Sequence, residues 1–337
     1  MHIIIIGGGI AGLGAAYKVR RAVDAGHDVT FTLVERDDRI GGKIWTDIAE
    51  DPDGGTYIAD GGSDSFLTDK TAVHRVARLL GIFERECGTL DDTKKTFIVK
   101  RGRLVEMPDG MMMFAPTKLL PLATSTLYSW PAKFRMALDF VIPRKQRWAE
   151  GETAQQHDET LESLVVRRLG RECLDRLAEP LAAGVNGDIA SEMSVAARYP
   201  MLLDMEQKHG SLVRGFLAQR KKVEEMRKKY PPKPGAKRRT MFSSFDLGLQ
   251  VVCDAMADAA GREHIRTGVA ATALERAGDG WRVTLSTGET LEADAVVVAP
   301  EVWVATELVK PVAPALGELL ETIPCSSCAT ALLAFDA

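Results

Sequence analysis

Three glycines near the start of the chain have the spacing of a loop that binds phosphate groups. They follow the β-branched run from His2 to Ile6 and precede a segment with the periodicity of a helix. In such a strand–loop–helix unit, Gly7 allows the tight turn, Gly9 lets backbone amides approach a pyrophosphate, and Gly12 lets the helix pack closely on the strand. The spacing therefore predicts a dinucleotide site at the end of the first strand.

A carboxylate at the end of the next expected strand completes this pattern. We expect a helix from Leu13 to Ala25, preceded by Ile10 and Ala11, whose amides would add partial positive charge beside the phosphates. A strand expected from Val29 to Val34 ends at Glu35. Glu35 can accept hydrogen bonds from ribose hydroxyls and would repel a 2′-phosphate, so FAD or NAD is favoured over NADP. The residues alone leave open a tight turn without a ligand.

The residues after Glu35 favour FAD through a resemblance to a known superfamily. Arg36 opens a segment that continues through Gly41, Gly42 and Lys43 and resembles the second flavin fingerprint of the amine-oxidase-like flavoproteins. The resemblance implies that the paired glycines let the backbone pass close to FAD and that a basic residue reaches its phosphates. Taken without the first pattern, Gly41-Gly42 is also compatible with a plain turn.

The second half of the chain resembles the returning half of the same FAD domain. We expect strands from Ile265 to Glu275 and from Ala295 to Ala299, the second of which is wholly apolar. The resemblance implies that the residue at Val269 meets the adenine through its backbone and that Ala299 and Pro300 pass near the cofactor. The FAD domain would then be discontinuous.

Further segments resemble the bacterial protoporphyrinogen/coproporphyrinogen oxidases. Gly61 and Gly62 are followed by Ser63, where that family has proline, and then by Asp64. By this resemblance Gly61, Gly62 and Ser63 contact the cofactor, and Asp64 approaches the flavin and the substrate; a turn or helix cap is the alternative role for Asp64. The other matching segments are Pro116–Pro121, Ser129–Ala137, Glu179–Leu181, Ala183–Val185 and His209–Leu212.

The resemblance implies oxidation of a porphyrinogen by FAD, with dioxygen as acceptor. Few acids or bases are then needed, because the cofactor performs the redox step. The family places a substrate-anchoring base where this chain has Thr96, which carries no charge; Lys95 and Arg101 lie nearby in an expected hairpin. The alternatives are another amine-oxidase-like flavoprotein, such as a carotenoid desaturase or an amine oxidase, and an inactive fragment.

The predicted fold class is α/β. We expect a discontinuous Rossmann-like FAD-binding domain, a mainly helical insertion, and part of a β-rich substrate domain. The expected ranges are 1–85 and 241–305 for FAD binding, 86–114 and 306–337 for the substrate domain, and 115–240 for the insertion, with a basic proline-rich loop at 231–239. A last strand is expected from Thr330 to Phe335.

The composition and net charge of the chain limit which classes of partner and which cellular location we expect. A net charge of −4 excludes nucleic acid as a main partner, and no apolar run is long enough to span a membrane. Five cysteines without a signal peptide indicate reduced thiols in the cytoplasm, and we expect no metal. The resemblance allows peripheral contact with the inner face of the membrane, a homodimer, and haem-pathway enzymes as partners. Family members continue beyond Ala337, so we expect this chain alone to bind FAD weakly.

Overall fold

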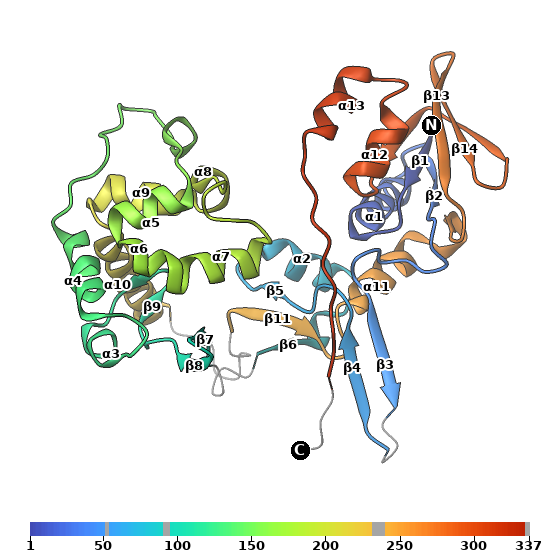
Figure 1. Ribbon diagram of the computed structural model, residues 1–337. Helices are drawn as coiled ribbons and strands as arrows, with labels where there is room; N and C mark the ends of the chain where they lie inside the picture. The colour runs from blue at the N-terminus through green and yellow to red at the C-terminus, as the bar shows by residue number, and fades with distance from the viewer. Residues whose placement is uncertain (51–53, 90–94, 231–239, 334–337) are drawn as a thin grey trace. The chain divides into compact units, whose positions relative to one another are not determined.

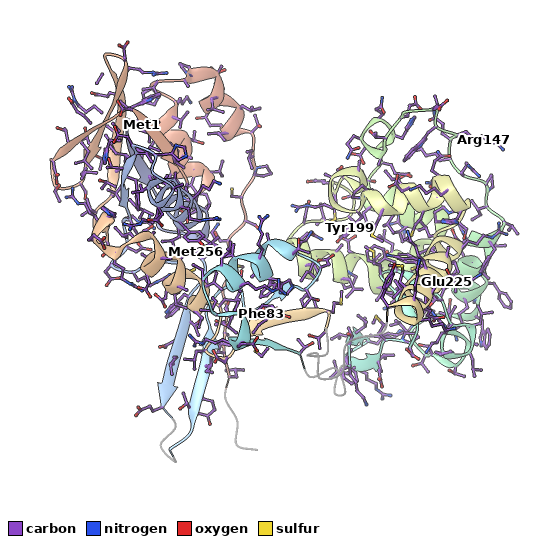
Figure 2. All side chains as sticks on the ribbon, turned by 180° about the vertical axis from the view of Figure 1, so that it is seen from behind. Met1, Phe83, Arg147, Tyr199, Glu225 and Met256 are labelled. Atoms are coloured by element: carbon purple, nitrogen blue, oxygen red, sulfur yellow. The ribbon has the colours of Figure 1, made fainter. Side chains whose placement is uncertain are left out.

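The computed structural model describes residues 1–50, 54–89, 95–230 and 240–333 and divides the chain into two compact units (Figure 1). The first unit consists of Met1–Asp91 and Arg238–Ala337, and the second of Asp92–Lys237. Figure 2 marks Met256 in the first unit and Tyr199 in the second. The expected basic loop at 231–239 lies outside the described residues.

A four-stranded parallel sheet forms the centre of the first unit. Its strands lie in the order β12 (Ile265–Arg266), β2 (Thr30–Val34), β1 (His2–Ile6) and β16 (Ala295–Val298). β1 has a partner on each side, and its Ile4 and Ile5 are completely buried. The β-branched run at the N-terminus suits this position because such strands are covered on both faces.

Two different layers cover the two faces of this sheet. Helices α1 (Ile10–Asp24) and α11 (Gln250–Ala260) share a core with Ile5. Ile4 and Ile6 pack instead against an antiparallel sheet of three strands, which are β13 (Ala271–Ala277), β14 (Gly280–Leu285) and β15 (Thr290–Ala293). Because successive side chains of a strand point to opposite faces, β1 is held between these layers.

Smaller elements complete the first unit. β11 (Phe242–Phe245) pairs antiparallel with both β5 (Phe66–Leu67) and β6 (Glu86–Gly88) and so joins the two parts of its sequence. A hairpin is formed by β3 (Thr46–Glu50) and β4 (Thr56–Asp60). The remaining helices are α2 (Thr71–Leu79), η1 (Phe83–Arg85), η6 (Arg262–His264), α12 (Val302–Val309) and α13 (Pro314–Glu321).

The second unit is mainly helical and has its own apolar core. Leu164, Leu177 and Phe216 are among its most buried side chains. Its two hairpins are β7 (Phe97–Lys100) with β8 (Arg103–Glu106) and β9 (Met111–Met112) with β10 (Ala115–Pro116). Its helices are α3 (Leu119–Thr124), α4 (Trp130–Ala137), η3 (Leu138–Phe140), η4 (Ala154–His157), α5 (Leu161–Arg168), α6 (Arg171–Cys173), the π-helical η5 (Leu174–Ala178), α7 (Glu179–Asn186), α8 (Val195–Arg198), α9 (Pro200–His209) and α10 (Leu212–Lys229).

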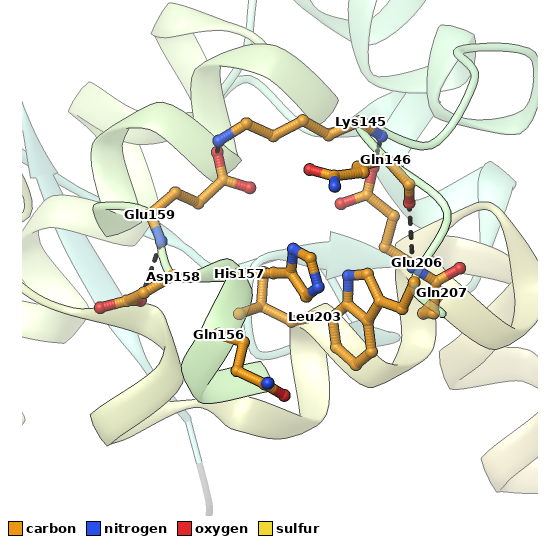
Figure 3. A pocket seen from close by; sticks show the side chains of 10 residues that line it. Lys145, Gln146, Gln156, His157, Asp158, Glu159, Leu203, Glu206 and Gln207 are labelled. Carbon is orange, nitrogen blue, oxygen red and sulfur yellow. Dashed lines mark hydrogen bonds and ion pairs between the residues drawn. The ribbon is translucent and has the colours of Figure 1, made fainter. Parts of the chain in front are cut away.

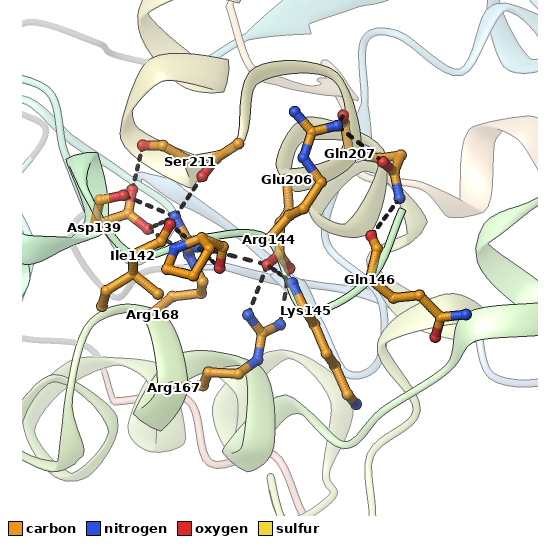
Figure 4. A network of polar contacts seen from close by, with 12 residues as sticks. Asp139, Ile142, Arg144, Lys145, Gln146, Arg167, Arg168, Glu206, Gln207 and Ser211 are labelled. Atoms are coloured by element: carbon orange, nitrogen blue, oxygen red, sulfur yellow. Dashed lines mark hydrogen bonds and ion pairs between the residues drawn. The ribbon is translucent and has the colours of Figure 1, made fainter. Parts of the chain in front are cut away.

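A buried ion pair ties several of these helices together (Figure 4). The guanidinium of Arg168 donates to the carboxylate of Asp139 at 2.6 Å, and both side chains are completely buried. Arg168 also donates to the carbonyls of Ile142 and Gly210, and Asp139 accepts from the hydroxyl of Ser211. Elements η3, α5 and the junction of α9 with α10 are therefore joined through one polar cluster.

The structure agrees with the expected α/β class and with most expected elements. The unit β1–α1–β2 is present, and β7 and β8 form the expected hairpin. Its turn residues Arg101 and Gly102 have φ values of 51° and 72°, as a two-residue turn of type I′ requires. The helix after the glycines begins at Ile10 rather than Leu13, because Gly9 already serves as its N-cap.

Two expectations about elements need correction, and one hairpin was not expected. The strand expected from Ile265 to Glu275 is two strands, β12 and β13, which belong to different sheets. Thr330–Leu333, the described part of the expected last strand, forms no strand. The hairpin β3–β4 was not expected, because most of its side chains are exposed and an exposed hairpin has no buried face to produce a clear alternation.

The expected substrate-domain segments do not form a unit of their own. Residues 86–91 and 306–337 belong to the first unit and 92–114 to the second. Which segments contribute to a substrate domain therefore stays a prediction. Among the described residues, no helix combines the length and apolarity needed to cross a membrane.

Candidate functional site

The glycines that follow β1 differ in the space around them: Gly12 is closely packed, whereas Gly9 borders open space. Gly7 has a φ of 104°, and a Cβ added to Gly12 would lie 1.8 Å from the carbonyl oxygen of Gly7. Gly12 is therefore required for α1 to pack on the end of β1. Around a Cβ built on Gly9, by contrast, no described atom outside its chain neighbours lies within 4 Å. Gly9 leaves open space at the N-terminus of α1, where backbone amides face outward.

The carboxylate of Glu35 lies beside this helix N-terminus. Oε2 of Glu35 accepts from the backbone amide of Gly8 at 2.5 Å, and Oε1 accepts from the amide of Asp37 at 2.8 Å. Only 8% of Glu35 is exposed. Two backbone donors fix its orientation, while an ionised carboxylate has about four acceptor positions and keeps capacity for hydroxyl groups of a ligand.

The second glycine segment packs directly on the first. The amide of Gly41 donates to the carbonyl of Gly8 at 2.9 Å, and a Cβ on Gly42 would lie 3.1 Å from Cα of Gly9. The guanidinium of Arg39 donates to the carbonyl of Gly42 at 2.8 Å and so holds the loop from within. The structure thus brings together two segments that the sequence places about 30 residues apart.

Lys43 and the segment from Gly61 to Ser63 continue this surface. A Cβ on Gly62 would lie 1.9 Å from the carbonyl oxygen of Lys43, and the amide of Gly61 donates to the carbonyl of Trp45. The ammonium of Lys43 lies 5.6 Å from the ring centre of Trp303. Gly61 and Gly62 therefore let their segment pack closely on the backbone of Lys43 and Trp45.

The returning strands close the far side of the site. The amide of Ala299, directly after β16, donates to the carbonyl of Ile6, and a Cβ on Gly7 would lie 3.0 Å from the backbone of Ala299. The amide of Val269 donates to the carbonyl of Glu35 at 2.9 Å. Val269 itself packs into the core, and Ala270 and Ala271 face the open side.

These segments enclose a cavity of about 440 Å³ in the first unit. The candidate residues that line it are Gly7, Gly9, Ile10, Ala11, Glu35, Arg36, Gly41, Gly42, Lys43, Ser63 and Ala299. Gly12, Gly61, Gly62 and Val269 support its walls without lining it. Pro300, which the resemblance places near the cofactor, lines it as well, and the lining residues that the sequence did not indicate are Ile6, Val34, Asp37, Ile44, Ala270, Ala271, Glu301 and Val304. Asp37 could have been noticed from its closeness to Glu35, whereas the apolar residues carry no signal of their own.

The lining fits the adenine-nucleotide part of FAD. The N-terminus of α1 and the cations of Arg36 and Lys43 suit phosphates, and Glu35 suits ribose hydroxyls. Small or apolar side chains such as Ala271 suit a flat ring. An empty space at Gly9 is also what close approach of a pyrophosphate requires.

The remaining candidates are not among the residues that line this cavity. Asp64 is exposed and accepts a hydrogen bond from the hydroxyl of Ser65 at 2.9 Å. Lys95, Thr96 and Arg101 belong to the second unit. Lys95 and Arg101 are exposed, and the carbonyl of Thr96 accepts from the amide of Met107. The roles of all four side chains stay predictions.

A smaller cavity in the second unit was not indicated by any sequence pattern. It measures about 200 Å³ and contains Trp148 stacked on His157, with ring centres 5.2 Å apart (Figure 3). Glu159 and Glu206 also line it, but both carboxylates are already paired with the guanidinium of Arg167. These two carboxylates are therefore not available as unpaired charges for a ligand in this cavity. Within the described residues, no group of His, Cys, Asp and Glu could hold a metal ion.

Comparisons with known proteins agree with this arrangement. The chain is 30% identical to the coproporphyrinogen III oxidases of Bacillus subtilis, over 88% of this chain and 59% of the relative, and of Propionibacterium freudenreichii, over 99% and 63%. The chain thus spans about three fifths of the length of these relatives. A crystal structure from Exiguobacterium sp. 255-15 with a provisional protoporphyrinogen oxidase assignment has a TM-score of 0.75 at 26% identity, covering 94% of this chain and 63% of that one.

The family comparison decides the class of cofactor. The model of the family described as flavin containing amine oxidoreductase matches residues 10–337. The predictions of an α/β fold, of FAD as the cofactor and of an oxidoreductase are confirmed at the level of this family. The chain belongs to the flavin containing amine oxidoreductases.

Proposed function

We propose that the protein is an FAD-dependent oxidase that converts a porphyrinogen to the porphyrin with dioxygen as acceptor, as a step in haem biosynthesis. Coproporphyrinogen III is the first candidate substrate, because both curated relatives described above carry that name. The observation that carries the proposal is the convergence of two glycine segments and Glu35 on one cavity. Protoporphyrinogen IX is the second candidate, since both substrates are cyclic tetrapyrroles with sp³ bridging carbons and carboxylates at the rim.

The residues of the cavity would hold and orient the nucleotide. Glu35 would accept hydrogen bonds from the ribose, and the amides at Gly9, Ile10 and Ala11 would face the pyrophosphate. Lys43 would contribute a cation to the phosphates. Bound FAD would supply each of three successive two-electron oxidations, with dioxygen taking up the electrons and protons as hydrogen peroxide, so the protein needs few acids or bases of its own.

The substrate carboxylates need a cation at the rim of an apolar slot. We propose Lys95 for this role, because Thr96 offers no charge and Arg101 lies at the tip of its hairpin. Asp64 is proposed to face the flavin and the substrate. Substitution of Lys95 by Met should raise KM for the porphyrinogen about tenfold and leave kcat nearly unchanged, as expected for loss of ground-state binding.

The test of the proposed function is oxidation of each porphyrinogen by the complete protein. Purified protein would be saturated with FAD, mixed with coproporphyrinogen III or protoporphyrinogen IX in air, and followed by porphyrin fluorescence. Porphyrin should form with consumption of dioxygen. Stoichiometric FAD without porphyrin formation would instead indicate another flavoenzyme, and absence of FAD binding would refute the assignment altogether.

We also propose a peripheral location at the cytoplasmic face of a membrane. Leu119, Leu120, Trp130 and Phe134 are between 61% and 74% exposed on α3 and α4 of the second unit. Grouped exposed apolar side chains of this kind mark interaction surfaces. A homodimer and contacts with other haem-pathway enzymes are further proposals.

Flotation with phosphatidylglycerol vesicles tests the membrane contact. The double variant with Leu120→Glu and Phe134→Glu should lose at least about tenfold in vesicle binding, because two charges would enter the interface. Val223→Glu adds a charge to an exposed position of α10 and serves as the control. Equal flotation of the wild type and the double variant would rule out this surface.

A further inference from the structure

The first residue of α11 lies directly behind the Gly41–Gly42 loop. Nε2 of Gln250 donates to the carbonyl oxygen of Ile40 at 3.3 Å. Oε1 of the same side chain is buried, and no donor among the described residues lies within hydrogen-bond distance of it. Gln250 as a whole is half-buried, but a buried amide oxygen without a donor is unusual and calls for a reason.

The unpaired oxygen faces Gly41. A Cβ added to Gly41 would lie 2.8 Å from Oε1 of Gln250 and 2.5 Å from the carbonyl oxygen of Ile44. Two oxygens therefore converge on the Cα of a glycine whose φ is 106°, which leaves room only for weak Cα–H···O contacts. The side chain of Gln250 thus leaves the Gly41–Gly42 loop no room to move toward α11.

On the side away from Gln250, the Gly41–Gly42 loop contacts the glycine segment at the N-terminus of α1. The amide of Gly41 donates to the carbonyl of Gly8, and a Cβ on Gly42 would lie 3.1 Å from Cα of Gly9. The loop is therefore held between Gln250 on one side and the first glycine segment on the other. A shift of the Gln250 side chain would be passed on to Gly42, which lines the cavity.

Gln250 is itself fixed by the base of the hairpin β3–β4. Its backbone amide donates to Oγ1 of Thr46 at 3.1 Å, and the amide of Leu249 donates to Oδ1 of Asp60 at 3.3 Å. The hydroxyl of Thr46 donates to the same carboxylate oxygen. These two side chains cap the start of α11, so the position of Gln250 does not depend on its own side chain.

We propose that Gln250 is a positioning residue for FAD, whose side-chain amide sets the place of the Gly41–Gly42 loop at the cavity. This inference rests on the proposed function, since it assigns the loop to the flavin nucleotide. The guanidinium of Arg39 also donates to the carbonyl of Ile40, but an aliphatic side chain at position 250 would remove the second donor, and a carboxylate there would repel the carbonyl oxygen.

The informative variant is Gln250→Glu. At pH 8 an ionised carboxylate against the carbonyl of Ile40 should displace the loop and raise the Kd for FAD about tenfold to a hundredfold. Glutamate is favoured in the first turn of a helix, so α11 should remain folded. The guanidinium of Arg39 donates to the same carbonyl of Ile40 and would attract the introduced carboxylate, so this group stays ionised at pH 5 and the Kd should remain raised at both pH values.

Titration of the complete protein with FAD, followed by flavin fluorescence at pH 5 and pH 8, tests this inference. Ala259→Glu adds the same charge to an exposed position of α11 and should behave as the wild type at both pH values. The proposal is overturned if Gln250→Glu binds FAD as tightly as the wild type does at either pH value. A wild type that binds no FAD would overturn the proposed function, and this inference with it.

Discussion

Gly9 and Gly12 differ in the space around them although both belong to one short segment. A Cβ on Gly12 would overlap the carbonyl of Gly7, whereas Gly9 borders the cavity and has open space where a Cβ would be. One glycine is therefore needed for folding and the other for access of a ligand. The sequence spacing predicted both roles because they follow from backbone geometry within a single turn.

Substitution by alanine should separate the two roles. Gly12→Ala should lower the free energy of unfolding by about 2–3 kcal/mol, since its Cβ would overlap a backbone oxygen. Gly9→Ala should cost less than about 1 kcal/mol but raise the Kd for FAD about tenfold. Urea unfolding and FAD titration measure the two effects. Wild-type FAD affinity in Gly9→Ala would show that this space is not used by the cofactor.

Residues that contact the glycine loops from other parts of the sequence were harder to predict from the sequence. Glu35 follows its strand directly, so its place beside the glycines could be inferred from the sequence. Gln250 and Asp60 reach the same region from segments far along the chain, and their types are common in ordinary helices and turns. Only the tertiary packing of α11 on α1 shows their connection to the loop.

At the scale of elements, the second unit depends on the buried pair of Arg168 and Asp139. Replacement of Asp139 by Asn would leave the guanidinium without its closest carboxylate, in a place with no exposure to solvent. The free energy of unfolding should fall by about 3–5 kcal/mol. Asp175→Asn is the matched control, because its pair with Arg171 is exposed and should contribute less than about 1 kcal/mol. Similar urea midpoints for the two variants would contradict this.

Acid should weaken the same unit through Glu159. Burial by itself raises the pKa of Glu159, but hydrogen bonds from Arg167 and Ser163, together with nearby positive charges, outweigh it and hold the pKa below its usual range. A carboxylate with a lowered pKa stabilises the fold fully above its unfolded pKa, about 4.3, and less as pH falls through the folded value. Unfolding free energies measured from pH 7 to pH 3 should therefore fall less steeply in Glu159→Gln than in the wild type.

Elements with a buried face were predictable, and elements without one were not. Apart from His2, β1 and β16 consist of apolar β-branched or small residues, which indicated buried parallel strands. β3 and β4 are largely exposed, so their sequences show no clear alternation, although their base caps α11. Their stability comes from pairing with each other and from contacts at Thr46 and Asp60.

At the scale of the whole molecule, the cysteines report which regions are packed. Cys173 and Cys253 are buried, and burial raises the pKa of each thiol to about 12. Cys87, Cys325 and Cys328 are exposed. A thiol reagent at pH 8 should therefore modify three cysteines of the reduced native protein and all five after unfolding. Rapid modification of Cys173 or Cys253 in the native state would show that the packing around it opens.

The pairing of β6 with β11 has a consequence for how such chains can diversify. Register partners such as Cys87 and Ser244 set the two parts of the first unit side by side on either side of the long intervening sequence. An insertion whose entry and exit are neighbours can be shortened, lengthened or exchanged without moving the strands that carry the glycine loops. Recombination at these neighbouring entry and exit points would join one nucleotide-binding scaffold to different helical insertions.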